Sequence, residues 1–574
     1  MMKINSILFT VIFIGIQIFT VAQQDEKIRF SGLTRSFFSR DVNKIDLDTT
    51  STKNFSSGYN LIDLNTHINP IKEIEVFAQL RISNQFGSFF GSGTNIIVRQ
   101  LTAKGVLGNR IKFTIGDMYL KQNKFTLHNY DEELPFFNSD FVSSYRDIVH
   151  YENFYTDNRW RLQGIQTNFS YEFDRFIKSL EFDFFITRPR GNQYITNLNR
   201  ISDMLLSGGS LISKINSNLT FESNYINLFE IPSTGNINIS VRNPVIQGGL
   251  NYHYNTPKAK LEHNIQGGFS ERSWLQFDSL TNYTVGMFSE FSSSYSKKDS
   301  SLSFSFGGRY VDPNFRSSGS QTRRINFNDN TPSIYSTYSN DESQRPISIF
   351  DIISDPTIYN QDLSTNLMGF NPIYSNSLPF GDATPNRLGV FAKLNLISKN
   401  KFLELNFNSS YFEEVIGQGS LLKRNFVLFS GNTKFNLHEI LGLNKKLSVS
   451  VSMVDETTKR SSSNAENVNL SSSQLNFSSS IETLNDLFIQ LGYKSFNSKG
   501  NEYLTTRSAY GMIQGFTPII YNQNDDIYIV GLKYKFRSNV YLNLQYNFWG
   551  TNFNDSNISD FKYQRLLFIF SVKL

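Results

Sequence analysis

The sequence contains no cysteine, which excludes disulfide scaffolds, thiolate metal sites, iron–sulfur clusters and cysteine nucleophiles. It also lacks an apolar run of ~20 residues beyond residue 22, so a bundle of transmembrane helices is excluded. An excess of one charge is missing too. The 55 Lys and Arg side chains exceed the 50 Asp and Glu side chains by only five, a balance too mild to indicate nucleic-acid binding.

Aromatic residues are abundant, with 53 Phe, 28 Tyr and 3 Trp among 574 residues, and such a composition excludes a disordered chain. The chain begins with the basic Met1-Met2-Lys3, continues with a short apolar run from Ile7 to Ile18, and then offers Thr20-Val21-Ala22. This order predicts a secretory signal peptide over residues 1–22, cleaved after Ala22. An uncleaved membrane anchor is the alternative, disfavoured because the apolar run is short and broken.

Alternation of apolar and polar residues is the dominant pattern of the remaining chain, residues 23–574. It is clear in 540–548, in 73–82 and in 447–453. A period of two predicts half-buried strands, and strands of ~9–11 residues with one apolar face suit the wall of a transmembrane barrel.

The connections between these strands alternate between tight turns and longer loops, as in outer-membrane barrels with short periplasmic turns and long external loops. Long loops are predicted near 41–57, 121–157, 191–203, 311–385, 458–467 and 497–525. Counting strands gives about 22, within a range of roughly 16–24. The predicted fold class is therefore all-β, a single large antiparallel transmembrane β-barrel.

The last segment supports closure of the barrel. Leu566, Phe568, Phe570, Val572 and Leu574 share one face of a terminal strand. Pairing of the last strand with the first would remove the exposed edges of the sheet, as a membrane requires.

The sequence resembles the outer-membrane β-barrel proteins of the Bacteroidota. The resemblance lies in Phe19-Thr20-Val21-Ala22-Gln23 at the predicted cleavage site, in the Asn/Ser/Phe/Tyr-rich strands, and in the terminal 568–574. It implies the outer membrane of a Gram-negative bacterium, contact with its lipid and lipopolysaccharide, and an assembly signal at Phe568, Phe570 and Leu574 read by the barrel-assembly machinery. In that family the final residue is often aromatic, whereas here it is Leu574.

The polar faces of the strands are expected to line the lumen. They mix charges with amides, a lining that suits polar solutes or a packed plug and does not select strongly for anions or cations. The predicted lumen-lining residues are Glu73, Glu75, Gln79, Arg81, Lys533, Lys535, Asn543, Gln545 and Asn547.

The segment 311–385 differs from the rest of the chain. It holds seven of the 14 prolines and carries eight acidic against four basic residues, yet it is rich in apolar side chains. Such a long loop is usually functional or disordered, and the apolar content favours folding into the lumen or over it as a cap. A surface loop packed on its own side chains is the alternative. The residues expected to plug or cap are Arg323, Arg324, Phe350, Phe370, Tyr374 and Phe380.

The segment 121–157 combines acidic residues, Asp131 to Glu133, with many aromatic residues. Acids and aromatic rings together can bind a sugar, but the aromatic girdle of the outer membrane interface is the favoured interpretation.

Sequence motifs of catalysis are missing. None of the six histidines forms HExxH, and no nucleophile elbow, phosphate-binding loop or dinucleotide fingerprint occurs. We therefore expect no cofactor and no enzyme activity, although an outer-membrane hydrolase stays open because catalytic triads are geometric.

The function predicted from the sequence is passage or uptake of polar solutes across the outer membrane, with the lumen occluded by an inward-folded loop. The alternative is a non-transporting barrel that serves as a structural partner in a surface or secretion assembly of the type IX secretion or gliding type. A periplasmic or surface protein partner follows from that alternative.

Overall fold

The structure is a computed structural model, and it describes residues 27–45, 52–86, 93–129, 143–152, 158–174, 176–190, 193–194, 200–201, 203–231, 239–276, 279–321, 363, 365, 367, 370–461, 466–508, 512–554 and 560–574. The predicted signal peptide, residues 1–22, lies outside the described residues.

Twenty-two strands form one closed antiparallel sheet, in which each strand pairs with the next along the chain. Its first eleven strands are β1 (Ile28–Ile45), β2 (Lys53–Ile71), β3 (Ile74–Gln85), β4 (Thr94–Leu107), β5 (Ile111–Leu120), β6 (Trp160–Glu172), β7 (Ser179–Arg190), β10 (Asp203–Lys214), β11 (Leu219–Ile231), β12 (Ile239–Asn255) and β13 (Ala259–Gln276). The others are β14 (Ser279–Lys297), β15 (Leu302–Val311), β16 (Arg387–Ile397), β17 (Leu403–Glu413), β18 (Asn425–Asn436), β19 (Leu447–Arg460), β20 (Val468–Leu484), β21 (Leu487–Arg507), β22 (Ile513–Arg537), β23 (Val540–Phe553) and β24 (Phe561–Lys573). The short strands β8 (Gln193–Tyr194) and β9 (Arg200–Ile201) pair with each other in the connection between β7 and β10.

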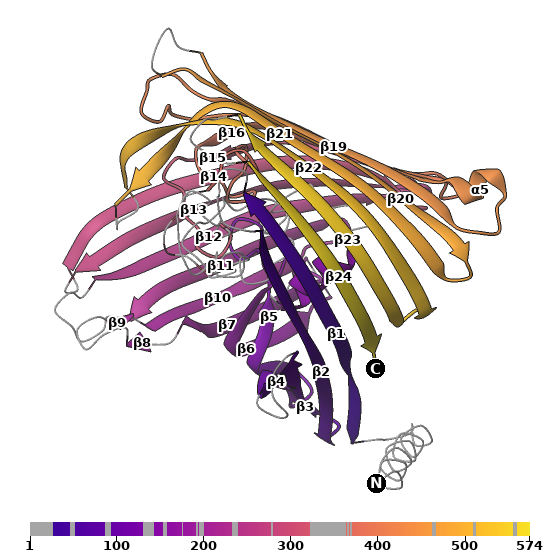
Figure 1. The fold of residues 1–574 in the computed structure, drawn as a ribbon. Helices are drawn as coiled ribbons and strands as arrows, with labels where there is room; N and C mark the ends of the chain where they lie inside the picture. Colours follow the sequence, from indigo (N-terminus) through magenta and orange to yellow (C-terminus); the bar gives the residue numbers. More distant parts are fainter. Residues whose placement is uncertain are drawn as a thin grey trace.

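The barrel closes where the last strand meets the first. β1 and β24 pair antiparallel from Leu33 opposite Lys573 to Ile45 opposite Phe561, so neither strand leaves an open edge there (Figure 1). The ion pair between Arg565 and Asp41, 2.6 Å apart, bridges the same seam on the inner face. The predicted fold class and the count of 22 strands are confirmed.

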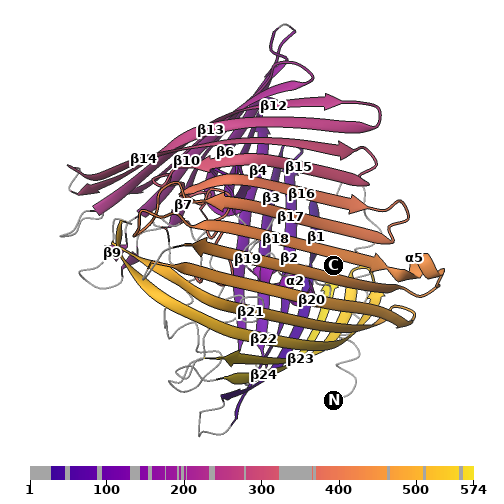
Figure 2. The same ribbon diagram turned by 90° about the horizontal axis from the view of Figure 1, so that it is seen from above.

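The two ends of the barrel differ in their connections. At one end, here called the turn side, neighbouring strands join through tight connections such as 72–73, 485–486 and 538–539. At the other end, the loop side, lie the connections 121–159 and 312–386. The carboxyl-terminal end of β24 lies at the turn side, as does α5 (Leu437–Leu441), which joins β18 to β19 (Figure 2).

Two predicted long loops are shorter than expected, because strands extend into them from both sides. The segment 41–57 holds the ends of β1 and β2, and 497–525 holds the ends of β21 and β22. The reason is visible in β21, where Asn497 and Lys499 are exposed on the outward face while Phe496 and Ser498 are buried on the inward face. Where the outward face is polar, the apolar alternation that marks a strand disappears from the sequence.

The outward and inward faces of the wall carry different kinds of side chain. In β24 the residues Leu566, Phe568 and Phe570 point outward, while Leu567 and Ile569 between them are buried on the inward face. The same division recurs in β23, where Leu544 and Tyr546 are exposed and the intervening amides are buried. Because the outward side chains of many strands are exposed and apolar, the barrel presents a hydrophobic outer surface.

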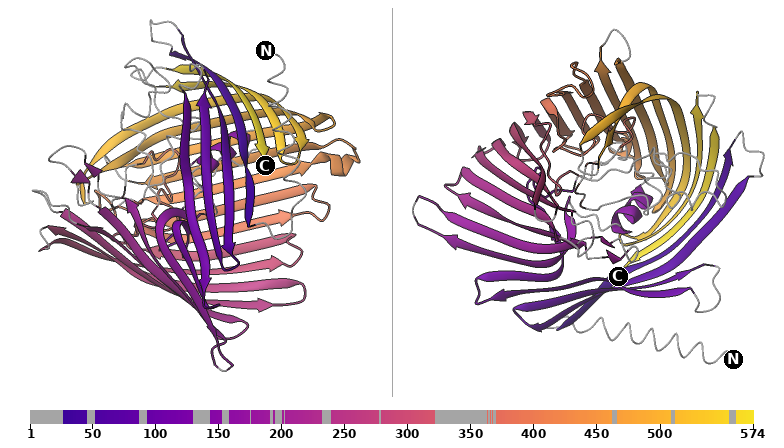
Figure 3. Two further views of the ribbon diagram at one scale, coloured as in Figure 1. Left: turned by 90° about the horizontal axis from the view of Figure 1, so that it is seen from below. Right: turned by 90° about the vertical axis from the view of Figure 1, so that its left-hand side faces the viewer.

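Among the described residues, the helices are α2 (Ser143–Glu152) and α5. Neither of them is long and apolar enough to cross a membrane. The view into the barrel shows α2 inside the ring of strands (Figure 3).

Candidate functional site in the barrel lumen

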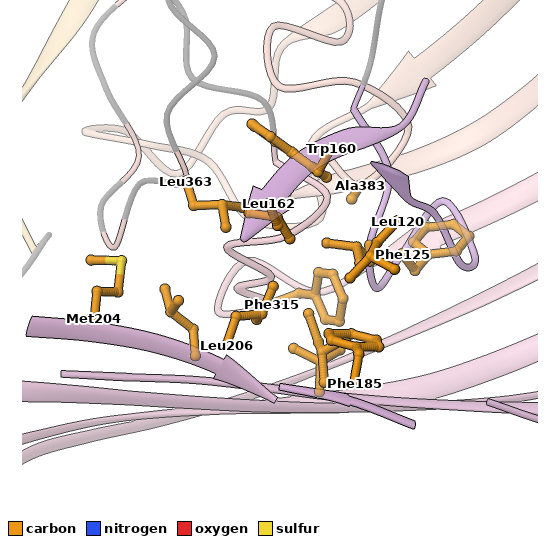
Figure 4. Packing of buried hydrophobic residues seen from close by; sticks show 14 of the residues in the cluster. Leu120, Phe125, Trp160, Leu162, Phe185, Met204, Leu206, Phe315, Leu363 and Ala383 are labelled. Carbon is orange, nitrogen blue, oxygen red and sulfur yellow. The ribbon is translucent and has the colours of Figure 1, made fainter. Parts of the chain in front are cut away.

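The lumen contains a hydrophobic core, here called the lumen core. Inward-facing side chains of the loop-side halves of β5, β6, β7, β10 and β11 pack against residues of the two long connections (Figure 4). Phe125 stacks on Phe288 with ring centroids 3.9 Å apart, and Phe315 packs edge-on against Phe288. The core comprises Met118, Leu120, Phe125, Leu127, Trp160, Leu162, Phe185, Met204, Leu206, Ile226, Leu228, Val245, Phe288, Val311, Phe315, Leu363 and Ala383. The sequence predicts that the polar faces of the strands line the lumen. The inner wall is instead apolar in this region.

Three consecutive residues of the first inward segment, 121–129, bind three regions of the wall. The Gln122 amide donates to the Gly209 carbonyl oxygen at 2.8 Å and to Ser210 Oγ at 3.1 Å on β10. The Asn123 amide donates to Gln266 Oε1 on β13 at 2.7 Å, and Lys124 Nζ lies 2.7 Å from Glu290 on β14. The segment is thus anchored across several strands.

The wall groups that receive these bonds belong to one network. Asn224 Nδ2 donates to Gln247 Oε1 at 2.7 Å, and Gln266 Nε2 donates to Glu290 Oε1 at 3.1 Å. All four side chains are buried on the inward faces of β11 to β14. Buried amides that satisfy one another in this way make a rigid polar surface.

The second inward segment, 312–321, packs against both the wall and the first segment. Ser318 Oγ donates to Asn243 Oδ1 on β12 at 3.0 Å, and Trp160 Nε1 on β6 donates to the Gly319 carbonyl oxygen at 2.8 Å. A Cβ added to Gly286 on β14 would lie 2.1 Å from the Phe315 backbone nitrogen. Only glycine therefore lets the segment approach the wall this closely.

An ion cluster joins the inward segments to each other. Arg309 on β15 pairs with Glu290 at 2.7 Å and with Asp382 at 2.9 Å. Lys124 pairs with the same two carboxylates, at 2.7 Å from Glu290 and 3.4 Å from Asp382. Two cations and two anions from four parts of the chain compensate one another in the lumen.

The third inward segment, 370–386, is held on the opposite part of the wall. Its residue Asn376 donates through its amide to Thr458 Oγ1 at 2.9 Å and to Glu502 Oε2 at 2.7 Å. Its backbone nitrogen also donates to Glu456 Oε1 at 2.7 Å. Arg424 pairs with Glu414 at 2.6 Å and with Glu502 at 3.0 Å, so the partner of Asn376 is itself fixed.

The helix α2 places Glu152 among three arginines of the wall. Glu152 lies 2.8 Å from Arg35 on β1, 2.6 Å from Arg81 on β3 and 3.5 Å from Arg99 on β4. Asp63 on β2 balances the cluster, pairing with Arg81 at 2.7 Å and Arg99 at 3.0 Å. We call these five residues the α2 latch.

Burial alone raises the pKa of the Glu152 carboxyl, but the hydrogen bond from Arg81 and the charges of Arg81, Arg99 and Arg35 outweigh it. The pKa of Glu152 therefore lies below its ordinary value. The carboxylate stays ionised under mildly acidic conditions, and with it the attraction that holds the end of α2 to the wall.

The other side of α2 packs on the seam of the barrel. Ile148 is buried against Phe37, Leu567 and Ile569, and the Tyr145 ring lies edge-on to Phe37 with centroids 5.8 Å apart. The tyrosines of α2 thus lie inside the lumen. The favoured interpretation of 121–157 as an outer girdle is wrong for these described residues.

The predicted lumen-lining residues occupy three settings. Glu73 lies exposed in the turn before β3, so that strand begins one residue later than expected. Glu75 pairs with His67 at 2.7 Å, Gln79 donates to Asn65 at 2.8 Å, and Arg81 belongs to the α2 latch. The remaining residues are on β22 and β23. On β22, Lys533 Nζ donates to Ser144 of α2 at 3.1 Å, and Lys535 lies over the Phe488 ring. On β23, the three amides are buried: Asn543, Gln545 and Asn547.

The predicted plug residues divide between described and undescribed parts of the chain. Tyr374 and Phe380 are buried, with the Tyr374 ring 5.3 Å from Phe496 of β21 and the Phe380 ring 5.7 Å from Phe370. Arg323, Arg324 and Phe350 lie outside the described residues. The residues of the predicted assembly signal, Phe568 and Phe570, are on the outward face of β24, and the role of Leu574 in that signal stays a prediction.

A cavity of about 570 Å³ lies on the turn side of the lumen core. Its lining comes from the turn-side halves of β6, β7, β10 and β11 and from both ends of β5, and the first inward segment borders it through Lys121 and Gln122. We call it the turn-side cavity. Among the described residues, no group of His, Asp or Glu has the arrangement needed to hold a metal ion.

Comparison with known proteins identifies no family for the chain. No protein-family model matches it, and no curated protein matches its sequence. Among solved structures it is similar to OpdQ of Pseudomonas aeruginosa, with 10% identity, 95% of this chain and 98% of that chain covered, and a TM-score of 0.32. A BenF-like porin from Pseudomonas fluorescens Pf-5 is similar over 95% of this chain and 99% of that chain, with 9% identity and a TM-score of 0.34.

A third similar structure is OccAB1 of Acinetobacter baumannii, with 9% identity, 96% and 99% coverage and a TM-score of 0.31. A likeness at these TM-scores carries no argument about function. The closed barrel is established by the pairing of its own strands.

Sequence reasoning missed most of the residues that hold the inward segments. Arg35 and Glu152 are 117 positions apart, and Asn376 and Glu502 are 126 apart. The one available signal was charge on strand faces predicted to point inward, which did identify Arg81.

Proposed function

We propose that this chain is an outer-membrane channel for polar solutes. The observation that carries the proposal is the contrast between the two surfaces of a closed wall. The outward face exposes apolar side chains, as contact with lipid requires, while much of the inward face carries amides and compensated charges. Such a wall suits the passage of solutes that cannot cross the lipid.

The proposal includes a resting state in which the inward segments occlude the lumen. Its support is the number of independent attachments: the lumen core, the cluster around Arg309, the bonds of Asn376 and the α2 latch. Each attachment joins a connection from the loop side to the inner wall. A passing solute would have to displace at least one of these segments.

Excision of 312–386 tests the channel and its occlusion together. Val311 and Arg387 are register partners on adjacent strands, so two or three glycines can join them as a hairpin without moving the wall. We expect the intact protein to conduct weakly in planar bilayers and the excised form to conduct several-fold more. Heat-modifiable migration on gels verifies that each form is a folded barrel.

A correctly folded excised form that remains silent would contradict the channel proposal. An intact protein that already conducts as strongly as the excised form would leave the channel standing and would contradict occlusion.

The location and partners of the chain follow from the same proposal. We place it in the outer membrane of a Gram-negative bacterium, with lipid and lipopolysaccharide against the outward face. The barrel-assembly machinery would insert it, as the resemblance of its terminal strand implies. The proposal involves no catalytic step.

A further inference from the structure

The inner faces of five neighbouring strands change character along their length. On β6, Trp160 and Leu162 belong to the lumen core, whereas Gln166 and Asn168, nearer the turn side, line the turn-side cavity. β11 repeats this order, with Leu228 in the core and Glu222 in the cavity. The cavity is therefore closed by apolar packing toward the loop side.

The first inward segment forms part of that closure. Gln122 lines the cavity and is fixed by its hydrogen bonds to Gly209 and Ser210. A solute in the cavity would lie next to this residue, and it would leave toward the loop side only if 121–129 moved. The contact between cavity and segment makes the cavity a place where a solute can be held before passage.

The polar lining of the cavity includes amides and carboxylates that are hydrogen-bonded to one another. Asp183 accepts two hydrogen bonds from the Gln166 amide, at 2.8 and 3.1 Å, and Glu222 accepts one from Asn224 at 2.6 Å. Glu181 pairs with Lys214 at 2.5 Å. A carboxylate has about four lone-pair sites, so each can accept further hydrogen bonds from a ligand.

The basic residues of the cavity lie at its rim. Arg110, Lys112, Lys121 and Arg159 are exposed, unlike the lining described above. Tyr119, half-buried, adds an aromatic ring among the polar groups. The cavity thus combines planar hydrogen-bonding groups with aromatic side chains, and its basic residues lie at the rim.

We infer that the turn-side cavity binds a neutral polyhydroxylated solute of the saccharide class. Each hydroxyl both donates and accepts, so it can donate to a carboxylate such as Asp183 and accept from an amide. The apolar C–H faces of a sugar ring can pack on Tyr119. An anionic solute would lie against the carboxylates of Asp183 and Glu222, and a cationic solute would have to pass the basic residues at the rim. The volume lies within the ~300–1,000 Å³ range of small-molecule sites.

This inference deepens the proposed function. It rests on the proposed function only in taking the lumen to be a path for solutes. The test is isothermal titration calorimetry of the purified barrel with three neutral trisaccharides, maltotriose, cellotriose and mannotriose. Lysine and glutamate serve as charged comparison ligands. We expect at least one trisaccharide to bind more tightly than either amino acid.

Two variants locate the binding. Gln166→Leu removes an amide that faces the cavity, and Tyr119→Ala removes the aromatic ring. Each is expected to weaken trisaccharide binding at least tenfold. Gln490→Leu is the matched control, because Gln490 is buried on β21 and lies outside the cavity. Heat-modifiable migration confirms that each variant is a folded barrel.

The inference is overturned if no trisaccharide binds, if an amino acid binds more tightly, or if Gln490→Leu weakens binding as much as Gln166→Leu. Bilayer conductance separates this result from the fate of the channel. Conduction without saccharide binding would reject the site and retain the channel. Binding in a barrel whose excised form stays silent would retain the site and reject the channel.

Discussion

Glu152 is the residue on which three arginines of the wall converge, and its side chain is only 17% exposed. We predict that Glu152→Gln loosens α2 and raises bilayer conductance several-fold. The amide keeps the size of the side chain but loses the charge, and a hydrogen bond to a charged group contributes about 1.5–3 kcal/mol. Glu439→Gln on α5, outside the lumen, is the control and should leave conductance unchanged. Equal conductance of Glu152→Gln and the unaltered protein would show that the α2 latch does not hold the closed state.

The same carboxylate predicts a pH dependence. The arginine partners of Glu152 lower the pKa of its carboxyl. The α2 latch therefore stabilises the attachment of α2 fully at any pH above ~4.3, the pKa of a glutamate in an unfolded chain. The contribution is lost as the pH falls through the lower folded value. We expect conductance of the unaltered protein to stay low at pH 5 and to rise only below about pH 4. Glu152→Gln should lack this rise, and a rise between pH 6 and 7 would contradict the assignment to Glu152.

At the scale of elements, the close approach of 312–321 to β14 depends on Gly286. We predict that Gly286→Ala displaces the segment, because the added Cβ would lie 2.1 Å from the Phe315 backbone nitrogen. The expected result is increased conductance with an intact barrel. Gly248→Ala on β12 is the matched control, since its Cβ would meet no atom within 4 Å. If both variants conduct alike, the segment does not contribute to closure.

The outward face of the closing strand predicts a second element-scale effect. Phe568 lies near the middle of β24, opposite Phe38 of β1. Phe568→Arg would place a charge against lipid, which costs about 2–4 kcal/mol at the membrane midplane. Urea unfolding of the protein in lipid bilayers should show this loss of stability, whereas Lys562→Arg should be neutral. An unchanged free energy of unfolding for Phe568→Arg would argue against lipid contact at this face.

The strands could be predicted from the sequence wherever a lipid-type apolar face alternates with a polar one, as in 540–548. They could not be predicted beyond that band, as the loop-side end of β21 shows, because the outward face there carries polar residues such as Asn497 and Lys499. The candidate site was harder still. A period of two tells which residues share a face, and it marked Arg81, but it cannot tell that α2 brings Glu152 to that arginine. The period of two also could not reveal the lumen core. Trp160 and Phe185 face inward there because of their tertiary packing against the long connections.

At the scale of the whole molecule, the wall is continuous and the inward segments are attached to it from several sides. The attachments use different chemistry: apolar packing at Phe315, ion pairs at Arg309 and hydrogen bonds at Asn376. Opening can therefore begin with the release of one segment while the others stay attached to the wall. A covalent lock at a single attachment can show which segment moves.

Because the sequence contains no cysteine, two introduced cysteines would be the only thiols that can form such a lock. Asn376 Nδ2 and Thr458 Oγ1 lie 2.9 Å apart, and a disulfide between cysteines at these two positions would tie segment 370–386 to β19. We predict that oxidation of this pair abolishes solute uptake into cells and that a reductant restores it, because solute passage requires the segment to leave the wall. Cysteines at Ser39 and Ser57, which are 2.9 Å apart within the wall between β1 and β2, provide the control, and their oxidation should leave uptake unchanged. Uptake that continues through the oxidised Asn376–Thr458 pair would show that solutes pass without movement of 370–386, and would assign the opening to α2 or to 121–129.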